Sequence, residues 1–377
     1  SAASDVYKRQ KQAHPESDAE ELMDEQKASS WVVDTALREY AAVLMEEYGI
    51  DEEKAFKRIN TGGYQIYTTV DLEMQKYVEE KYSDLNNLMD AESNSTWVDE
   101  DEDGEYEQLY PESAFIAMDY NGNILSIAGG IGVKEKLLIF NRATMAKRQP
   151  GSCIKPITTY GLALYSDHIH WGSMYKDSPI KLEGEKWPEN YDYVWRGYNM
   201  FIFEALRESR NTVPAQLCQE LTPQAVFNFA TQNLNVDLVD ITEEGATDIA
   251  YAPLTVGALT YGISPQNLVN AYIPYGNGGT YCDAHIVSRV ERGDGSVVYE
   301  NDGNPHEAID PETAYVMNHL LQEVIKNGTG TAAQLSNKTV AGKTGTSEDW
   351  NDLCFVGLTE DFVSGVWIGY DLSLIHI

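Results

Sequence analysis

Basic residues are scarce in this 377-residue sequence. Lys and Arg number 27 against 60 Asp and Glu, which gives a formal net charge of −33 at pH 7. Proteins that bind nucleic acid neutralise phosphates with Lys and Arg, and an anionic membrane surface would repel so acidic a chain. The composition therefore argues against nucleic acid as a partner.

Long apolar runs and paired cysteines are lacking as well. No run approaches the roughly 18 apolar residues of a membrane span, and no signal peptide is visible. The four cysteines, Cys153, Cys218, Cys282 and Cys354, form no CxxC pair and no dense framework, so they do not decide the redox compartment. With 42% apolar residues, the chain is long enough for one large or two medium globular domains.

The two ends of the sequence look foreign to the rest. One DNA string encodes residues 1–10, SAASDVYKRQ, and the reverse complement of its last codons encodes residues 372–377, LSLIHI. Complementary readings of one string resemble a translated sequencing adapter. We interpret both ends as adapter-derived, exclude them from fold reasoning, and expect the natural gene to continue on both sides.

The segments before residue 113 carry no predicted chemistry. Residues 11–60 read as an interdomain linker region, charged at first and then apolar at helical spacing after Ser30, a candidate N-cap. A predicted domain of residues 61–371 begins with a short strand and a helix after Asp71. Residues 86–112 are acidic and predict a solvated loop or insertion.

Strands are predicted early and late in this domain, and helices between them. Two apolar runs around Asn121-Gly122 indicate a β-hairpin. Asp310-Pro311 opens a helix that stops at Asn327-Gly328. The β-rich runs after it are separated by tight turns, as in consecutive antiparallel strands. This order predicts an α+β fold with one sheet assembled from both chain ends and helices packed on it.

Three short patterns point to nucleophilic chemistry: Ser-x-x-Lys, Ser-x-Asn and Lys-Thr-Gly. From average residue usage, a chain of this length holds about one or two Ser-x-x-Lys and about one Ser-x-Asn by chance, but only on the order of 0.1 Lys-Thr-Gly. Ser173/Lys176 and Ser178/Lys181 are such chance matches, because neither opens an apolar helical run. Taken alone, each motif serine is more simply a helix cap.

Ser152/Lys155 differs from these two matches in its context. Pro150-Gly151 interrupts the preceding structure, and Pro156 is tolerable only within a first helical turn. A helix start at Gly151 would place the serine and the lysine on one face. Ser209-Arg210-Asn211 and Lys343-Thr344-Gly345 follow in order, the combination typical of penicillin-binding proteins and class A β-lactamases.

At these residues the sequence resembles the transpeptidase domain of class A penicillin-binding proteins. The resemblance runs from about residue 30 to 371 and includes RQPGSCIKP, ESRNTVPAQL and AGKTGTSEDWNDLCFVGL. It implies a five-stranded antiparallel sheet with helices on both faces, a helical subdomain, and a C-terminal helix that we expect to be missing from this sequence. The last strand, FVSGVWIGY, carries large apolar residues on both parities, as expected of a strand buried on both faces. Without the C-terminal helix, we expect one of these faces to lie partly open.

The resemblance also implies roles for the motif residues in acyl transfer. Ser152 is the expected nucleophile, and it needs a base because a hydroxyl is a weak nucleophile. Lys155 can be that base only if it is neutral, and the charge of Lys343 and a helix N-terminus would both lower its pKa. Ser209 would relay a proton to the leaving amine. Asn211 would hold the peptide backbone of the substrate.

The third motif would bind the end of the substrate. Lys343, Thr344 and Thr346 would present a cation and hydroxyls to a terminal carboxylate, with Gly345 between them. The backbone N–H groups of Ser152 and Thr346 would form the oxyanion hole, which is usually the largest contribution in acyl transfer. No metal and no cofactor is implied. Two departures are Cys153, beside the nucleophile, and Cys354, where the family often has tryptophan.

The implied substrate is the D-Ala-D-Ala end of a peptidoglycan stem peptide, and β-lactam antibiotics should acylate the same serine. The implied place is extracytoplasmic, at the outer face of the cytoplasmic membrane. We expect the full-length protein to carry a membrane anchor and a glycosyltransferase domain that this sequence does not contain.

Two alternatives stay open at this point. A D,D-carboxypeptidase or β-lactamase would use water in place of the amine acceptor, although no Glu-x-x-Leu-Asn follows the Ser-x-Asn motif, which disfavours a class A β-lactamase. A penicillin-sensing domain would be acylated without turnover. The rate of deacylation discriminates between these readings.

Overall fold

The computed structural model describes residues 30–98, 106–347 and 350–371. Residues 1–10 and 372–377, interpreted as adapter-derived, lie outside this part of the chain. Two compact units are present: Ser1–Ala146 with Asp283–Pro305 and Ile368–Ile377, and Lys147–Cys282 with His306–Trp367. We call them the first unit and the second unit. No helix within the described ranges is long and apolar enough to cross a membrane.

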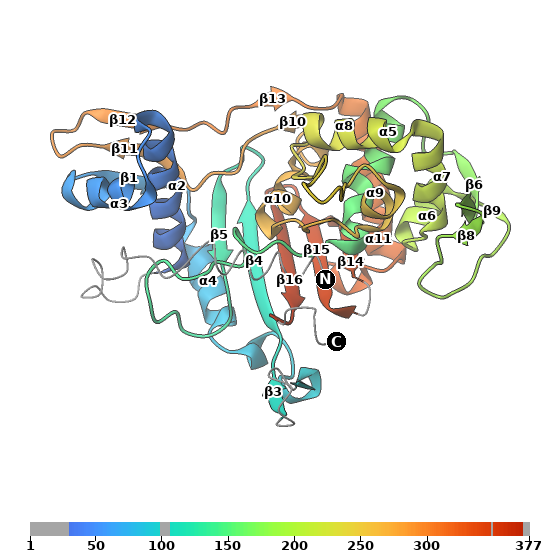
Figure 1. Ribbon diagram of the computed structural model, residues 1–377, viewed down its shortest axis with the longest axis horizontal. Coiled ribbons are helices and arrows are strands. Elements are labelled where there is room, and N and C mark those ends of the chain that lie inside the picture. Colours follow the sequence, from blue (N-terminus) through green and yellow to red (C-terminus); the bar gives the residue numbers. More distant parts are fainter. Residues whose placement is uncertain (1–29, 99–105, 348–349, 372–377) are drawn as a thin grey trace. The chain divides into compact units, whose positions relative to one another are not determined.

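The central sheet draws its strands from both parts of the sequence, as predicted (Figure 1). Its order is β14-β15-β16-β4-β5. The bounds are β4 (Glu112–Met118), β5 (Ile124–Ala128), β14 (Ala341–Thr346), β15 (Asp352–Leu358) and β16 (Val363–Gly369). The hairpin predicted at Asn121-Gly122 joins β4 and β5, and Gly122 takes the positive φ of 82° that its turn requires. The predicted five-stranded antiparallel sheet is thereby confirmed.

The described part of the first unit opens with two helices, and each begins directly after an N-cap residue. Ser30 caps α2 (Trp31–Tyr48), and Asp51 caps α3 (Glu52–Thr61). Strand β1 (Gln65–Thr68) pairs with β11 (Val287–Glu291), which also pairs with β12 (Val297–Glu300). Asp71 opens α4 (Leu72–Tyr82), as the sequence predicts. Helix α4 packs on β5.

The acidic segment of residues 86–112 contains more regular structure than the predicted loop. Two short 3₁₀ helices, η1 (Leu85–Asn87) and η2 (Glu92–Asn94), precede a two-stranded ladder. Its strands are β2 (Thr96–Val98) and β3 (Glu107–Leu109). Side-chain oxygens of Asp84 and Asp90 accept backbone N–H groups at the two turns, which is how short polar residues build such local structure.

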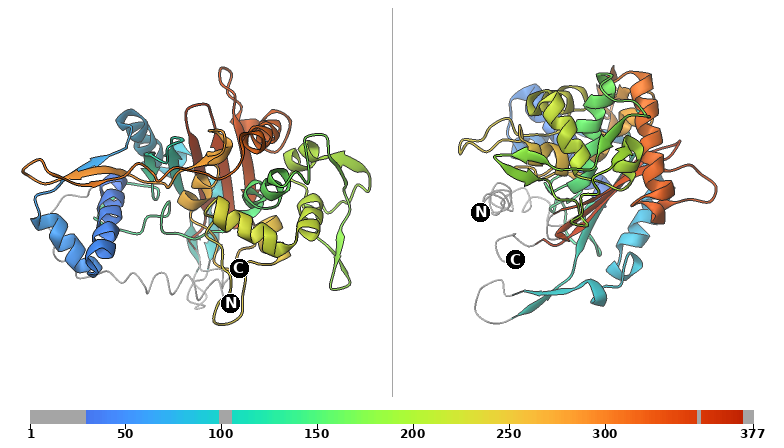
Figure 2. Two further views of the ribbon diagram at one scale, coloured as in Figure 1. Left: turned by 90° about the horizontal axis from the view of Figure 1, so that it is seen from above. Right: turned by 90° about the vertical axis from the view of Figure 1, so that its right-hand side faces the viewer.

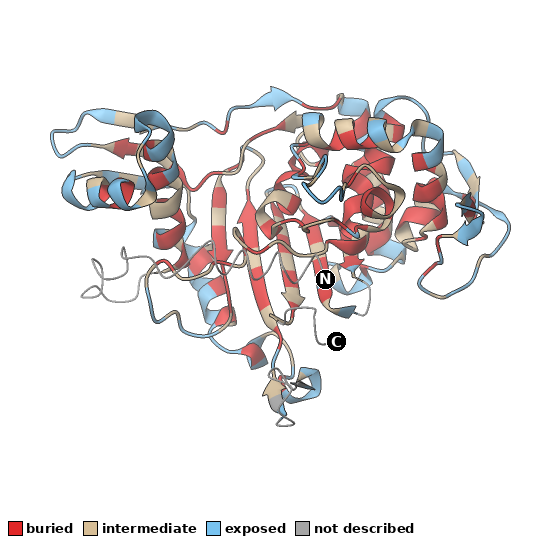
Figure 3. Ribbon diagram, in the orientation of Figure 1, coloured by how far each residue is buried: buried red, intermediate tan, exposed pale blue. Residues whose placement is uncertain are grey.

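Most of the described helices belong to the second unit. They are η3 (Gly151–Ile157), α5 (Thr159–Tyr165), α6 (Ile202–Arg207), α7 (Thr212–Leu221), α8 (Pro223–Asn233), α9 (Tyr251–Val256), α10 (Pro265–Asn270), η4 (Ile273–Tyr275), α11 (Pro311–Asn327) and η5 (Thr331–Ala333). Helix α5 is almost wholly buried (Figure 3). Helix α9 ends at Val256, because Gly257 adopts a left-handed conformation there.

Two elements pack against β14 in the second unit. Helix α11, capped by Asp310 as predicted and drawn in orange in Figure 2, lies against the face of β14 that carries Gly342, and η3 lies against the face that carries Gly345. Short ladders complete the unit: β6 (Met174–Lys176) with β9 (Asn199–Phe201), β7 (Ile180–Leu182) with β8 (Glu185–Trp187), and β10 (Thr280–Tyr281) with β13 (His306–Glu307). The segment that holds β6 to β9 leads directly into α6.

Strand β16 has one fully buried face and one half-buried face. Burial alternates strictly along it: Val363, Gly365, Trp367 and Gly369 are buried, whereas Ser364, Val366 and Ile368 are half-buried. This pattern agrees with the prediction that one face of the strand lies partly open.

Candidate active site

The predicted nucleophile lies on a tighter turn than the predicted α-helix. Residues Gly151–Ile157 form the 3₁₀ helix η3, and α5 follows only at Thr159. Pro156 inside η3 has no N–H to donate. In a 3₁₀ helix residues i and i+3 eclipse each other, so Ser152 and Lys155 still share one face. Ser152 is partly exposed, whereas Lys155 is completely buried.

The Lys155 amine is surrounded by oxygens of the second motif. Its Nζ lies 2.8 Å from the Ser209 carbonyl oxygen and 3.5 Å from Ser209 Oγ. It also lies 2.6 Å from Asn211 Oδ1 and 3.2 Å from the Arg210 carbonyl oxygen. All four acceptors are uncharged. A neutral amine has two N–H groups, which would match the two shortest of these contacts.

The turn that supplies these oxygens is backbone-strained. Ser209 joins α6 to α7 with a φ of +55°, a left-handed conformation that a residue with a Cβ adopts only at a cost. Such outliers gather at functional sites, where the surrounding structure over-determines them. Here the conformation turns both the carbonyl and the hydroxyl of Ser209 toward the buried lysine.

Lys343 reaches the same serine from the sheet. Strand β14 places its Nζ 3.0 Å from Ser209 Oγ and 2.9 Å from the Thr344 carbonyl oxygen. Ser209 Oγ therefore lies between two amines, Lys155 and Lys343. Residues alternate across a strand, and the Thr344 hydroxyl accordingly does not join this group. It lies 2.6 Å from Thr329 Oγ1 instead.

The end of β14 runs against the nucleophile turn. A Cβ added to Gly151 would lie 2.3 to 2.7 Å from three backbone atoms of Thr346, including its nitrogen. A Cβ on Gly345 would lie 2.1 Å from the Pro150 carbonyl oxygen. Both glycines are needed for this close approach. The contact brings the Thr346 backbone against Gly151, the residue that precedes Ser152.

Burial is the main cause of the unusual electrostatics of the two lysines. It lowers the pKa of Lys155 well below the ordinary 10.5, and the positive charges of Lys343 and Arg210 lower it further. Burial likewise lowers the pKa of Lys343 to about 8. The sequence pointed to Lys343 and a helix N-terminus, whereas desolvation is the larger effect.

The cysteine beside the nucleophile is held as a protonated thiol. Burial raises the pKa of Cys153 to about 12. Its Sγ lies 3.2 Å from the Lys343 carbonyl oxygen. A buried thiol of high pKa is a poor nucleophile, so the oxidisable group expected beside Ser152 is chemically shielded. All four cysteines are buried.

The two other Ser-x-x-Lys matches lie elsewhere. Lys176 and Lys181 are exposed on strands β6 and β7, so neither amine shares the burial that perturbs Lys155. Within the described ranges, no cluster of three or more His, Cys, Asp and Glu side chains is arranged to hold a metal ion.

One residue of the site escaped sequence reasoning. Arg210, between Ser209 and Asn211, is completely buried and ion-paired with Asp177 and Asp192. The sequence carries only a weak signal that Arg210 is buried. An arginine between two motif residues is expected to be solvent-exposed unless its carboxylate partners, 33 and 18 positions earlier, are known.

Known proteins match this chain over most of its length. Residues 113–371 match the family model described as the penicillin binding protein transpeptidase domain. Penicillin-binding protein 1A of Clostridium botulinum is 31% identical over 92% of this chain and 41% of its own length. Penicillin-binding protein 4 of Bacillus subtilis is 29% identical over 85% of this chain and 47% of its own length. The chain thus spans less than half of these relatives.

Solved structures share the fold. The PonA1 protein of Mycobacterium tuberculosis in complex with penicillin V aligns with a TM-score of 0.70 and 23% identity, over 92% of this chain and 85% of that one. Penicillin-binding protein 1A of Haemophilus influenzae aligns with a TM-score of 0.68 and 18% identity, over 90% of this chain and 66% of the other.

Proposed function

This chain belongs to the transpeptidase family of penicillin-binding proteins, and we propose that it is a serine D,D-transpeptidase acylated on Ser152. The observation that carries the proposal is the buried Lys155 amine. It has uncharged acceptors and a strongly lowered pKa, and it lies one 3₁₀ turn from the hydroxyl. A neutral amine in this place is the base that a serine nucleophile needs.

Acylation forms one bond and breaks another. The Ser152 hydroxyl gives its proton to Lys155 while its oxygen attacks the penultimate carbonyl of a D-Ala-D-Ala stem peptide. The backbone N–H groups of Ser152 and Thr346 would stabilise the resulting oxyanion. As the C–N bond breaks, the leaving D-Ala amine takes a proton through Ser209 Oγ, which lies within 3.5 Å of both lysine amines.

The second half-reaction restores the enzyme. An amine of a neighbouring stem peptide attacks the acyl-enzyme, loses a proton to the same lysine pair, and forms the new amide as the Ser152 hydroxyl is released. Only the nature of this acceptor separates a transpeptidase from a carboxypeptidase, in which water attacks instead.

Substrate binding is assigned to residues of the second and third motifs. Lys343, protonated below a pKa of about 8, would bind the terminal carboxylate, and the exposed hydroxyl of Thr346 at the end of β14 would add a hydrogen bond. The Oδ1 atom of Asn211 is occupied by Lys155, and its Nδ2 donates to the Glu189 carbonyl oxygen at 2.8 Å. The second N–H of that amide would serve the substrate backbone.

The wider context is proposed with the activity. β-Lactams would acylate Ser152 as substrate mimics, and the relatives and structures named for penicillin support this. We propose residues 61–371 as the transpeptidase domain, after a linker region of residues 11–60. The full-length protein would be membrane-anchored and act outside the cytoplasmic membrane, joined to a glycosyltransferase domain.

Turnover of a donor peptide tests the function. The chain is incubated with a peptide ending in D-Ala-D-Ala and with a free D-amino acid as acceptor, and the products are separated by mass. We expect D-Ala release and a transfer product that increases with acceptor concentration, both abolished in Ser152→Ala. Release without transfer would indicate a hydrolase, and a stable acyl-enzyme without release would indicate a sensing domain.

A further inference from the structure

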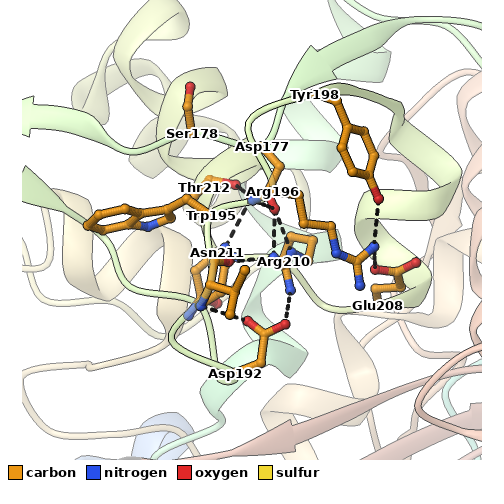
Figure 4. Close-up of polar contacts among 12 residues, drawn as sticks. Asp177, Ser178, Asp192, Trp195, Arg196, Tyr198, Glu208, Arg210, Asn211 and Thr212 are labelled. Atoms are coloured by element: carbon orange, nitrogen blue, oxygen red, sulfur yellow. Dashed lines mark hydrogen bonds and ion pairs between the residues drawn. The ribbon is translucent and has the colours of Figure 1, made fainter.

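Arg210 is the centre of a buried charge cluster behind the Ser-x-Asn turn (Figure 4). Its Nη2 lies 2.6 Å from Asp177 Oδ2, and its Nε donates to the same oxygen at 3.1 Å. Its Nη1 donates to Asp192 Oδ2 at 2.7 Å. The side chains of Arg210 and Asp177 are both 0% exposed. This burial is unusual for charged groups and requires such complete pairing.

The same carboxylate also holds the residues that follow Arg210. Asp177 Oδ1 accepts a hydrogen bond from Thr212 Oγ1 at 2.6 Å and another from Asn190 Nδ2 at 3.0 Å. Asn190 in turn accepts the backbone N–H of Asn211 at 2.8 Å. Three consecutive residues, 210 to 212, are thus tied to one buried acid and its amide neighbour.

The contacts of residues 210 to 212 also restrain the residue before them, Ser209, whose backbone is strained. Ser209 holds a φ of +55°, which is sterically unfavourable for a side chain with a Cβ. Its carbonyl and hydroxyl oxygens are the atoms that contact Lys155 and Lys343. A relaxed Ser209 would move both oxygens away from the amines.

We propose that Arg210 is a positioning residue of the acylation site, which, paired with Asp177 and Asp192, holds Ser209 in the conformation that bridges Lys155 and Lys343. The inference rests on the proposed function, because it assigns Arg210 a part in acylation. Arg210 itself has no side-chain contact with the nucleophile among those described, so it acts through the turn.

Arg210 could also act through its positive charge, which lowers the pKa of Lys155. Lys155 is faced by Lys343, Arg210 and Cys153, and Arg210 contributes less to the lowering of the Lys155 pKa than burial and Lys343 do. The charge of Arg210 is also balanced by two carboxylates. Geometry is therefore expected to dominate, and a substitution that keeps the charge but loses the forked contacts separates the two effects.

The test is the acylation kinetics of the full chain with a fluorescent penicillin. The limiting acylation rate constant and the apparent dissociation constant are measured separately, and peptide mapping of the wild-type adduct reports on Ser152. Arg210→Gln and Arg210→Lys should both lower the rate constant by on the order of 10- to 100-fold. The dissociation constant should change little, because the penicillin does not touch Arg210.

Arg289→Gln is the matched control. Its guanidinium pairs with Glu291 at 3.2 Å on strand β11, and neither residue adjoins the Ser209 turn in sequence. This variant should acylate within about twofold of the wild type. Asp192→Asn is a milder perturbation, because the Asp192 side chain is 30% exposed. It should fold and lose part of the acylation rate.

Each outcome either supports or overturns the positioning role of Arg210. Arg210→Gln that is folded by circular dichroism and acylates like the wild type would overturn the proposal, and so would full rescue by Arg210→Lys, which would assign the effect to charge. If the Arg210 variants do not fold, wild-type kinetics in Asp192→Asn would show a purely structural role. An adduct elsewhere than on Ser152 in the wild type would refute the proposed function instead.

Discussion

The close backbone contact between β14 and the nucleophile turn predicts how strongly Gly345→Ala should disturb the site. A Cβ on Gly345 would lie 2.1 Å from the Pro150 carbonyl oxygen and 2.9 Å from Cys153 Sγ. Ordinary contact begins at 3.4 Å, so strand β14 and the nucleophile turn must separate by about 1.3 Å in Gly345→Ala. The obstructing atom is backbone and cannot rotate away.

Two consequences follow for this variant. Overpacking of this kind costs about 1–3 kcal/mol of unfolding free energy. A displacement of about 1 Å at reacting groups can cost on the order of 100-fold in rate, and here the shift separates Ser152 from the Thr346 backbone. Urea denaturation and fluorescent-penicillin acylation measure the two effects.

Gly172→Ala is the control for this comparison. A Cβ at Gly172 would meet the His170 ring at 3.7 Å, an ordinary contact, so stability and acylation should stay near wild type. If Gly345→Ala acylates within twofold of the wild type and unfolds at the same urea concentration, then β14 and the nucleophile turn are not in backbone contact, and the oxyanion geometry inferred from that contact fails.

Three further predictions concern neighbouring groups. Because Lys343 has a pKa of about 8 and binds a carboxylate only when protonated, the second-order constant of penicillin acylation should fall as the pH rises through about 8; a rise continuing to pH 10.5 would contradict this role. Tyr272→Phe removes a 2.6 Å hydrogen bond to the buried Cys153 carbonyl oxygen and should lower the unfolding free energy by about 1–3 kcal/mol in urea denaturation; an unchanged value would refute the contact. Since all four cysteines are buried, a thiol reagent should label none of them in the native chain and four after unfolding, and rapid native labelling of Cys153 would show that the nucleophile turn is open.

Local signals made much of the fold predictable. Ser30, Asp71 and Asp310 cap the helices that follow them, and the Asn121-Gly122 pair forms its hairpin. These features depend on residues a few positions apart, which a sequence displays directly. The motif order likewise identified the residues that converge on Ser209, because each motif carries its own reactive group.

Features that depend on distant partners were not predictable. Arg210 can be buried because it pairs with Asp177, which lies 33 positions earlier. No local sequence pattern predicts that pairing. The pKa of Lys155 depends mainly on how completely the fold excludes water from it. The 3₁₀ form of η3 and the position of the Thr344 hydroxyl, bonded to Thr329, also depend on packing rather than on residue type.

The central claim is that Ser152 is the nucleophile and Lys155 its base. The most direct measurement is to label the chain with a fluorescent penicillin, digest it, and identify the modified residue by mass spectrometry. A single adduct on Ser152, lost in Ser152→Ala and retained in Ser173→Ala and Ser178→Ala, is the predicted result. An adduct on Ser173 or Ser178, or labelling that survives Ser152→Ala, would contradict the account.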